Sequence, residues 1–158
     1  MAEEGTSYFL DTSALVKLYH HELGSEIVEA WVANQAVQIR LSELARVELH
    51  SVFVRKVREG ELTEAILQAV LECFREDLHS RFQVVPLTDD IVDRAISLLL
   101  SQAKNYPLRT LDALHIACAQ AVEKSGLAFV TADKKLFTAA SGLFSCIIDP
   151  EAKVGLGP

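Results

Sequence analysis

The sequence TLDALHIACA, from Thr110 to Ala119, has the features expected of the start of a buried helix. Thr110 is a residue type that caps helices, and Asp112 falls in the first turn, where free N–H groups and the helix dipole favour an anion. The residues after Asp112 are almost all small or apolar, so we predict that this helix is largely buried. A carboxylate at the mouth of a buried helix is costly unless a cation or hydrogen-bond donors meet it. Asp112 is therefore a candidate site residue.

The composition is that of an ordinary globular chain. Of its 158 residues, 50% are hydrophobic and 23% are charged, which suits one domain with a full-sized core. We expect residues 1–150 to form this single domain and residues 151–158 to form a flexible tail. The acidic N-terminus lacks the pattern of a signal peptide, and no apolar run has the length of a membrane span, so we expect no contact with a membrane.

The cysteines and the net charge narrow the class of protein further. Cys73, Cys118 and Cys146 form no CxxC pair, which argues against a structural zinc or disulfide framework and favours the reducing cytoplasm. The formal net charge of −7 argues against a general nucleic-acid coat, which is normally basic. It is compatible with a nuclease, because metal ions neutralise a cluster of acids locally.

Short β-prone segments alternate with amphipathic helical segments along the whole chain. This alternation predicts an α/β fold, a three-layer α/β/α sandwich around a central parallel sheet. Pro86 indicates either the end of the third strand or an edge position for this strand in the sheet. The predicted strands cover residues 7–10, 37–40, 82–87, 127–132 and 144–148.

Four acids occupy comparable places in this predicted fold. Asp11 and Asp133 directly follow strands, Glu48 lies in the helix after the second strand, and Asp112 opens the helix before the fourth. Ligands of such folds bind at the carboxyl ends of the strands, so we expect the four carboxylates to share that edge. Converging carboxylates repel one another unless a cation is present. Mg²⁺ and Mn²⁺ prefer oxygen ligands and assist the hydrolysis of phosphodiesters, which is the chemistry this pattern indicates.

Each of these acids also has an ordinary structural explanation. The aspartates could cap their helices or interact with the helix dipoles. Glu48 could pair with a buried arginine, either Arg46 or Arg109. We expect His115, one turn after Asp112, to be a packed core residue with one hydrogen-bonded nitrogen.

Four short motifs, FLDTSAL (9–15), SELARVE (42–48), LDALHIA (111–117) and FVTAD (129–133), follow one another in this order. Together they resemble the successive motifs of PIN-domain ribonucleases, and most of all the VapC-type toxins of toxin–antitoxin pairs. The resemblance implies a PIN-like fold over residues 1–150. It also implies an endoribonuclease dependent on Mg²⁺ or Mn²⁺, a homodimer, and an antitoxin that blocks the site.

The resemblance assigns roles to individual residues. The catalytic and metal-binding acids fall on Asp11, Glu48, Asp112 and Asp133, and hydroxyl positions beside the first and last acid fall on Ser13 and Thr131. Basic residues near the motifs are candidates for RNA contact: Lys17, Arg109, Lys134 and Lys135. The function predicted in this way is the hydrolysis of RNA phosphodiester bonds with a metal-activated water, by the toxin of a toxin–antitoxin pair.

Three other classes of function compete with this prediction. A receiver-type phosphoacceptor module should carry paired acids after its first strand, where this chain has only Asp11, and Lys153 is a poor match for its lysine. A catalytically silent PIN-like binding module would bind a protein partner only. A DNA-directed nuclease uses similar acid clusters, but usually carries more acids and additional elements that grip DNA.

Overall fold

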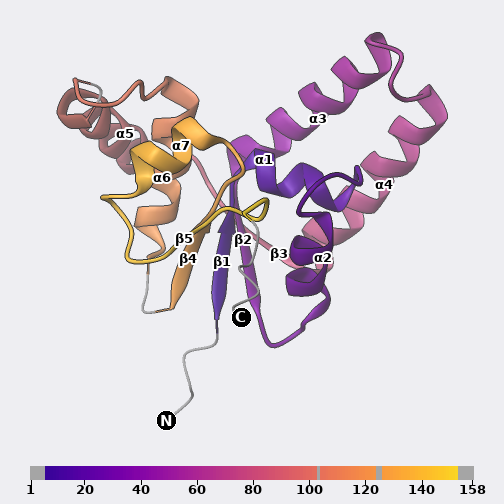
Figure 1. Ribbon diagram of the computed structural model, residues 1–158, viewed down its shortest axis with the longest axis horizontal. Helices are drawn as coiled ribbons and strands as arrows, with labels where there is room; N and C mark the ends of the chain where they lie inside the picture. The colour runs from indigo at the N-terminus through magenta and orange to yellow at the C-terminus, as the bar shows by residue number, and fades with distance from the viewer. Residues whose placement is uncertain (1–5, 103, 124–125, 153–158) are drawn as a thin grey trace, which may run out of the picture.

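A five-stranded parallel sheet lies at the centre of the structure, with helices on both of its faces (Figure 1). This computed structural model describes residues 6–102, 104–123 and 126–152. The strand order is β3-β2-β1-β4-β5, so the third strand lies at an edge, one of the two alternatives predicted from Pro86. The strands are β1 (Ser7–Leu10), β2 (Gln38–Ser42), β3 (Phe82–Val85), β4 (Leu127–Val130) and β5 (Ile147–Ile148).

Two hydrophobic clusters fill the space between the sheet and its two helical layers. Successive residues of one strand point to opposite faces, so Phe9 packs with α5, α6 and α7 while Leu10 packs with α1 to α4. The predicted three-layer fold is therefore confirmed. The helices are α1 (Thr12–Leu15), the 3-10 turn η1 (Val16–Leu18), α2 (Ser25–Ala33), α3 (Glu43–Arg58), α4 (Glu64–Ser80), α5 (Asp89–Gln102), α6 (Thr110–Ala121) and α7 (Lys134–Ala140).

The last three predicted strands were too long, and the second was placed too early. β3 ends at Val85, directly before Pro86, and β2 runs from Gln38 to Ser42. β4 ends at Val130, because the next residue, Thr131, turns its hydroxyl to the side chain of Asp11 and its chain continues into the cap of α7. β5 begins only at Ile147, after the exposed residues Ser145 and Cys146. All four differences concern the ends of strands and leave the order of the sheet unchanged.

Helix α6 is buried as predicted, but its N-cap is Arg109 rather than Thr110. An N-cap residue has an extended backbone. Arg109 has this conformation, with φ −93° and ψ 165°, and Thr110 is already helical. The backbone N–H of Arg109 donates to Oδ2 of Asp112 at 3.2 Å. The carboxylate of Asp112 is thereby held at the start of the helix.

The segment after β5 is fastened to the loop before α2 by Lys17. This side chain is only 1% exposed, and it donates to Glu22 Oε1 at 2.9 Å, Glu151 Oε1 at 2.7 Å and the carbonyl of Leu23 at 2.8 Å. Burial by itself would lower the pKa of Lys17, but the two carboxylates raise it overall, so the side chain stays charged. Glu151 is thus part of the folded domain and not of a flexible tail. The rest of the predicted tail, from residue 153 onward, lies outside the described residues.

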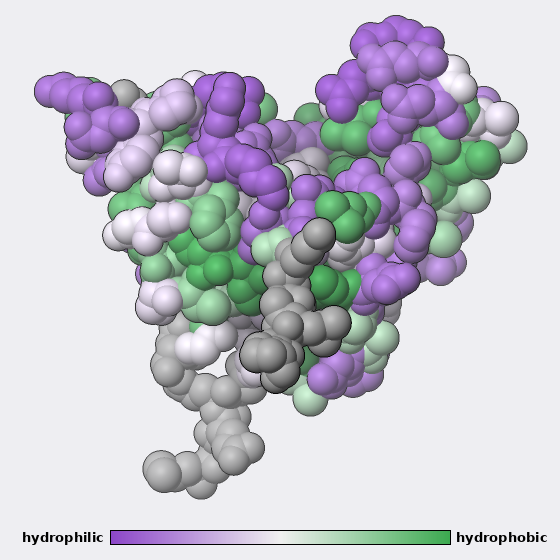
Figure 2. All heavy atoms as spheres, viewed as in Figure 1, coloured by the Kyte–Doolittle hydropathy of each residue, from purple (hydrophilic) through white to green (hydrophobic). Residues whose placement is uncertain are grey.

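Helices α3 and α4 form a hairpin that extends beyond the sheet (Figure 1). On the surface, a notch separates this hairpin from the side of the molecule that carries α5 and α6 (Figure 2). The notch opens at the carboxyl ends of the strands. Within the described part of the chain, no helix combines the length and the apolar character needed to cross a bilayer.

Gly24 and Gly60 provide a matched test of how closely the segment after β5 packs against the loop before α2. Both have positive φ, 87° and 76°, but a Cβ on Gly24 would lie 2.6 Å from the carbonyl oxygen of Pro150, whereas a Cβ on Gly60 would meet nothing within 4 Å. We expect Gly60→Ala to lower the free energy of unfolding by about 1–2 kcal/mol, the usual cost of a non-glycine residue with a left-handed backbone. Gly24→Ala should cost at least about 1 kcal/mol more, because the Pro150 segment must move. Urea unfolding measures the free energy of unfolding of both variants. Equal decreases in the two variants would contradict the close approach of Pro150 to Gly24.

Candidate active site

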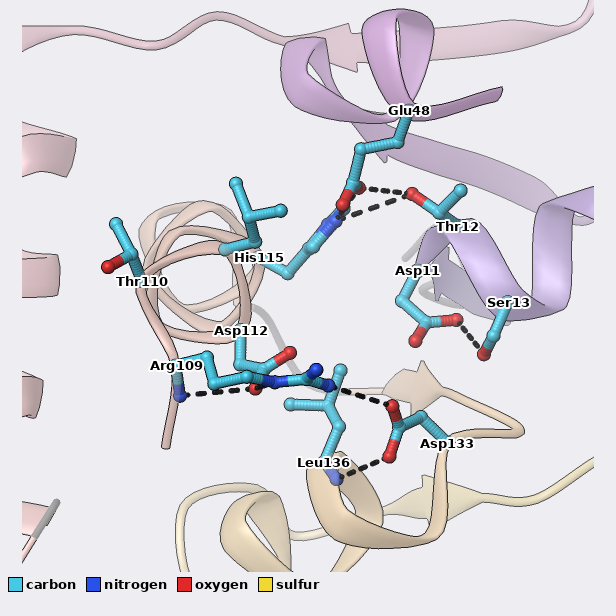
Figure 3. Close-up of a pocket in the computed structure, with 11 residues that line it drawn as sticks. Asp11, Thr12, Ser13, Glu48, Arg109, Thr110, Asp112, His115, Asp133 and Leu136 are labelled. Atoms are coloured by element: carbon cyan, nitrogen blue, oxygen red, sulfur yellow. Dashed lines mark hydrogen bonds and ion pairs between the residues drawn. The ribbon is translucent and has the colours of Figure 1, made fainter. Parts of the chain in front are cut away.

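The four predicted acids line a single pocket at the carboxyl edge of the sheet (Figure 3). Its cavity is about 400 Å³ in volume. Asp11 follows β1 directly, Glu48 projects from α3, Asp112 lies in the first turn of α6, and Asp133 caps α7. The structure thus brings together side chains that are up to 122 positions apart (133 − 11). The remaining lining residues are Thr12, Ser13, Arg109, Thr110, Leu111, His115 and Leu136.

Asp11 is the most deeply buried of these acids, with 3% of its surface exposed. Its Oδ1 accepts hydrogen bonds from Ser13 Oγ at 2.7 Å and from the N–H of Ala14 at 2.9 Å, and its Oδ2 accepts from Thr131 Oγ1 at 2.6 Å. Burial raises the pKa of Asp11, and these donors and the nearby imidazole of His115 offset only part of that rise. The capping role considered for Asp11 is therefore present together with its place in the pocket.

Ser13 and Thr131, the two predicted hydroxyl positions, connect Asp11 to the end of β4. Ser13 Oγ accepts from the N–H of Ala132 at 2.8 Å, and Thr131 Oγ1 accepts from the N–H of Asp133 at 3.1 Å. Each hydroxyl therefore donates to the first acid and accepts from the backbone that carries the last one. This arrangement sets the position of Asp133 relative to Asp11.

Glu48 is paired with a histidine and not with an arginine. Its Oε2 lies 2.5 Å from His115 Nε2 and accepts from Thr12 Oγ1 at 2.5 Å. Burial on its own would raise the pKa of Glu48, but the hydrogen bonds from His115 and Thr12 and the electrostatic interaction with His115 lower it overall. The two arginines considered as partners have other carboxylates: Arg46 is near Glu43, and Arg109 contacts Asp112 and Asp133.

The sequence analysis missed two pocket residues that contact Glu48: Thr12, which donates to it, and His115. His115 is buried, as expected, with 3% exposure, but both ring nitrogens have partners: Nε2 faces Glu48, and Nδ1 lies 3.0 Å from Ser42 Oγ. Ser42 Oγ in turn accepts from the N–H of Ala45 and so caps α3, the helix of Glu48. The signal in the sequence that could have identified His115 was its spacing from Asp112. Residues three apart on a helix share a face, so a pocket that contains Asp112 is within reach of His115.

Asp112 and Asp133 share one cation, the guanidinium of Arg109 (Figure 3). Arg109 Nε lies 3.3 Å from Asp112 Oδ2, and a terminal nitrogen lies 3.4 Å from Asp133 Oδ2. The other oxygen of Asp133 accepts from the N–H groups of Lys135 at 2.8 Å and Leu136 at 3.1 Å. Asp133 therefore caps its helix and faces the pocket at once.

The lysines proposed for RNA contact are placed differently from one another. Lys17 corrects that prediction, because it is buried and all three of its donors are used within the fold. Lys134 is exposed but pairs with Asp149 and lies 3.7 Å from Glu151. Lys135 is exposed at the start of α7. RNA contact by Lys134, Lys135 and Arg109 stays a prediction.

The carboxylates are held by protein donors in this structure. Among the described residues, no three His, Cys, Asp or Glu side chains lie close enough to form a metal-binding group as they stand. The physical reason is that each acid faces a hydroxyl, the imidazole or the guanidinium. The chemistry of the donor set nevertheless fits a hard divalent cation, because four carboxylates from four elements line one cavity.

The structure is an α/β sandwich in which acids from four elements meet at the carboxyl edge of the sheet. This combination defines a class of proteins, and comparison with known families identifies that class. The model of the PIN domain family matches residues 8–142. The chain belongs to the PIN-domain family.

Similar proteins narrow this placement. The chain is 35% identical over 133 residues to Ribonuclease VapC45 of Mycobacterium tuberculosis, which covers 84% of this chain and 88% of that protein. It is 30% identical over 133 residues to Ribonuclease VapC47 of the same species, covering 82% and 87%. At this identity and coverage the chain is placed with the VapC proteins.

Solved structures share the fold at lower identity. FitAcB from Neisseria gonorrhoeae matches with a TM-score of 0.67 and 19% identity, covering 90% of this chain and 97% of that chain. VapC20 from Mycobacterium tuberculosis matches with a TM-score of 0.62 and 16% identity, covering 84% and 94%. These similarities support the predicted PIN-like fold.

Thr131 offers a test of how Asp11 is held. Thr131→Val removes the donor to a buried carboxylate and the acceptor of the Asp133 N–H, with little change in shape. We expect the free energy of unfolding, measured with urea in metal-free buffer, to fall by about 1–3 kcal/mol, the cost of leaving a buried hydrogen-bonding group without its partner. Thr138→Val is the matched control, because the hydroxyl of this exposed residue only donates to a carbonyl of its own helix. An equal loss in both variants would contradict the role of Thr131.

Proposed function

We propose that this protein is a metal-dependent endoribonuclease and the toxin of a toxin–antitoxin pair. One observation carries the proposal: Asp11, Glu48, Asp112 and Asp133 line one pocket, although they come from four separate elements. The VapC relatives, named as ribonucleases, support RNA as the substrate. We propose Mg²⁺ or Mn²⁺ as the cofactor, because carboxylate oxygens are the ligands that these cations prefer.

Asp11, Glu48 and Asp112 would hold the cation, and Asp133 would complete the same site or a second, weaker one. When bound, such an ion lowers the pKa of a water and neutralises charge on the phosphoryl group. The protein's own part is to keep the carboxylates in place. Ser13 and Thr131 orient Asp11, while Thr12 and His115 orient Glu48. No side chain of the pocket is required as a nucleophile.

The proposed partners follow from the same relatives. A cognate antitoxin is proposed because the curated relatives are VapC proteins. The fold also resembles chains in structures such as a toxin–antitoxin complex from Klebsiella pneumoniae, at a TM-score of 0.59 and 22% identity, covering 90% of this chain and 97% of that chain. We also propose a homodimer, and the cytoplasm as the site of action, where RNA and a reducing environment are both available.

Cleavage of a total-RNA pool by the purified protein with Mg²⁺ or Mn²⁺ tests the proposal. We expect EDTA to abolish cleavage. Asp11→Asn and Asp112→Asn should each lower turnover by at least about 100-fold, since even residues behind metal ligands typically contribute 10- to 100-fold. Asp93→Asn is the control, an exposed aspartate on α5 outside the pocket, and it should keep full turnover.

The alternative functions predict other results in the same assay. Cleavage of DNA in preference to RNA would indicate a DNA-directed nuclease. Absence of both cleavage and metal binding would indicate a silent PIN-like binding module. Full turnover of a folded Asp11→Asn protein would contradict the assignment of the four acids as the catalytic site.

A further inference from the structure

Arg109 is the one cation that contacts two of the four acids within the described residues. Its side chain is anchored at its base, because Arg109 is the N-cap of α6 and its own backbone N–H donates to Asp112. From there the guanidinium extends across the pocket to Asp133 (Figure 3). Three nitrogens of one residue therefore hold the two carboxylates on this side of the site.

The hydrogen bonds of the carboxylate oxygens show which of these oxygens Arg109 already occupies and which stay available to a metal ion. Oδ1 of Asp133 is taken by two N–H groups of α7, so Oδ2 is its outward oxygen, and that oxygen faces Arg109. Oδ2 of Asp112 accepts from both the backbone and Nε of Arg109. On the opposite side, Glu48 and Asp11 face only neutral hydroxyls, backbone N–H groups and His115.

A second metal ion would need the same two oxygens. Two-metal sites hold their ions about 3.5–4 Å apart and place carboxylates between or around them. A guanidinium is always charged and forms planar, forked contacts with carboxylates. It therefore supplies one positive charge to Asp112 and Asp133 without an ion, and a divalent cation must displace it to reach Asp133.

We propose that Arg109 takes the place of a second metal ion, so that the site binds one divalent cation rather than two. This inference deepens the proposed function and rests on its metal dependence. The single ion then lies on the side of Asp11, Glu48 and the free oxygen of Asp112. Asp133 acts as a positioning residue, which holds Arg109 and caps α7.

Counting bound Mn²⁺ on the full-length protein by electron paramagnetic resonance tests the inference without any substrate. We expect one ion per chain for the unchanged protein and two for Arg109→Gln, the second binding more weakly. The double variant Arg109→Gln with Asp133→Asn should return to one. Lys135→Gln is the control: it removes one positive charge two residues after Asp133, from a side chain that makes no ion pair among the described contacts, and should leave one ion.

Failure of this inference is distinguishable from failure of the proposed function. One ion in Arg109→Gln, or two ions in the unchanged protein, would overturn the role of Arg109 and leave the metal dependence intact. No bound ion in the unchanged protein would overturn the metal dependence itself. Should Arg109→Gln fail to fold, Asp133→Asn alone gives a second test. It should keep one ion with nearly unchanged affinity, and loss of that ion would overturn the inference.

Discussion

The buried charge of Asp11 is the constraint on which the rest of the site depends. Asp11 directly follows β1, the middle strand of the sheet, and only 3% of its surface is exposed. An unpaired carboxylate there would be very costly. The donors that satisfy it come from both sides: Ser13 and Ala14 from α1, and Thr131 from the end of β4. Because the N–H of Asp133 donates to the same Thr131 hydroxyl, satisfying the first acid also positions the last.

The other acids are compensated by charged or polar groups of the protein itself. Glu48 faces His115 and Thr12, while Asp112 and Asp133 face Arg109. These contacts limit the repulsion that converging carboxylates would otherwise suffer. They also explain why a pocket rich in acids shows no metal-binding group as its described side chains stand. The site has two unlike sides, one with neutral donors and an imidazole, the other with a permanent cation.

Much of this arrangement was predictable because it depends on local patterns. The order of strands and helices followed from hydrophobic periodicity, and acids placed directly after parallel strands share an edge by geometry. Two of the errors have different causes. Thr110 is a good capping residue, yet Arg109 has the extended backbone that a cap needs. Lys17 lies near a motif in the sequence, yet it is buried against Glu151, 134 positions away, and no local pattern reports such a contact.

The sequence by itself determined the α/β class, the buried helix after Arg109 and the four acids at one edge of a parallel sheet. These features follow from residue types and their spacing, since each depends on neighbours within a few positions. Only the tertiary structure decided which group faces each acid: His115 for Glu48, and Arg109 for both Asp112 and Asp133. The physical reason is that these contacts join elements far apart in the chain. Glu48 and His115, for example, are 67 positions apart, and their distance is set by how α3 and α6 pack at the end of the sheet.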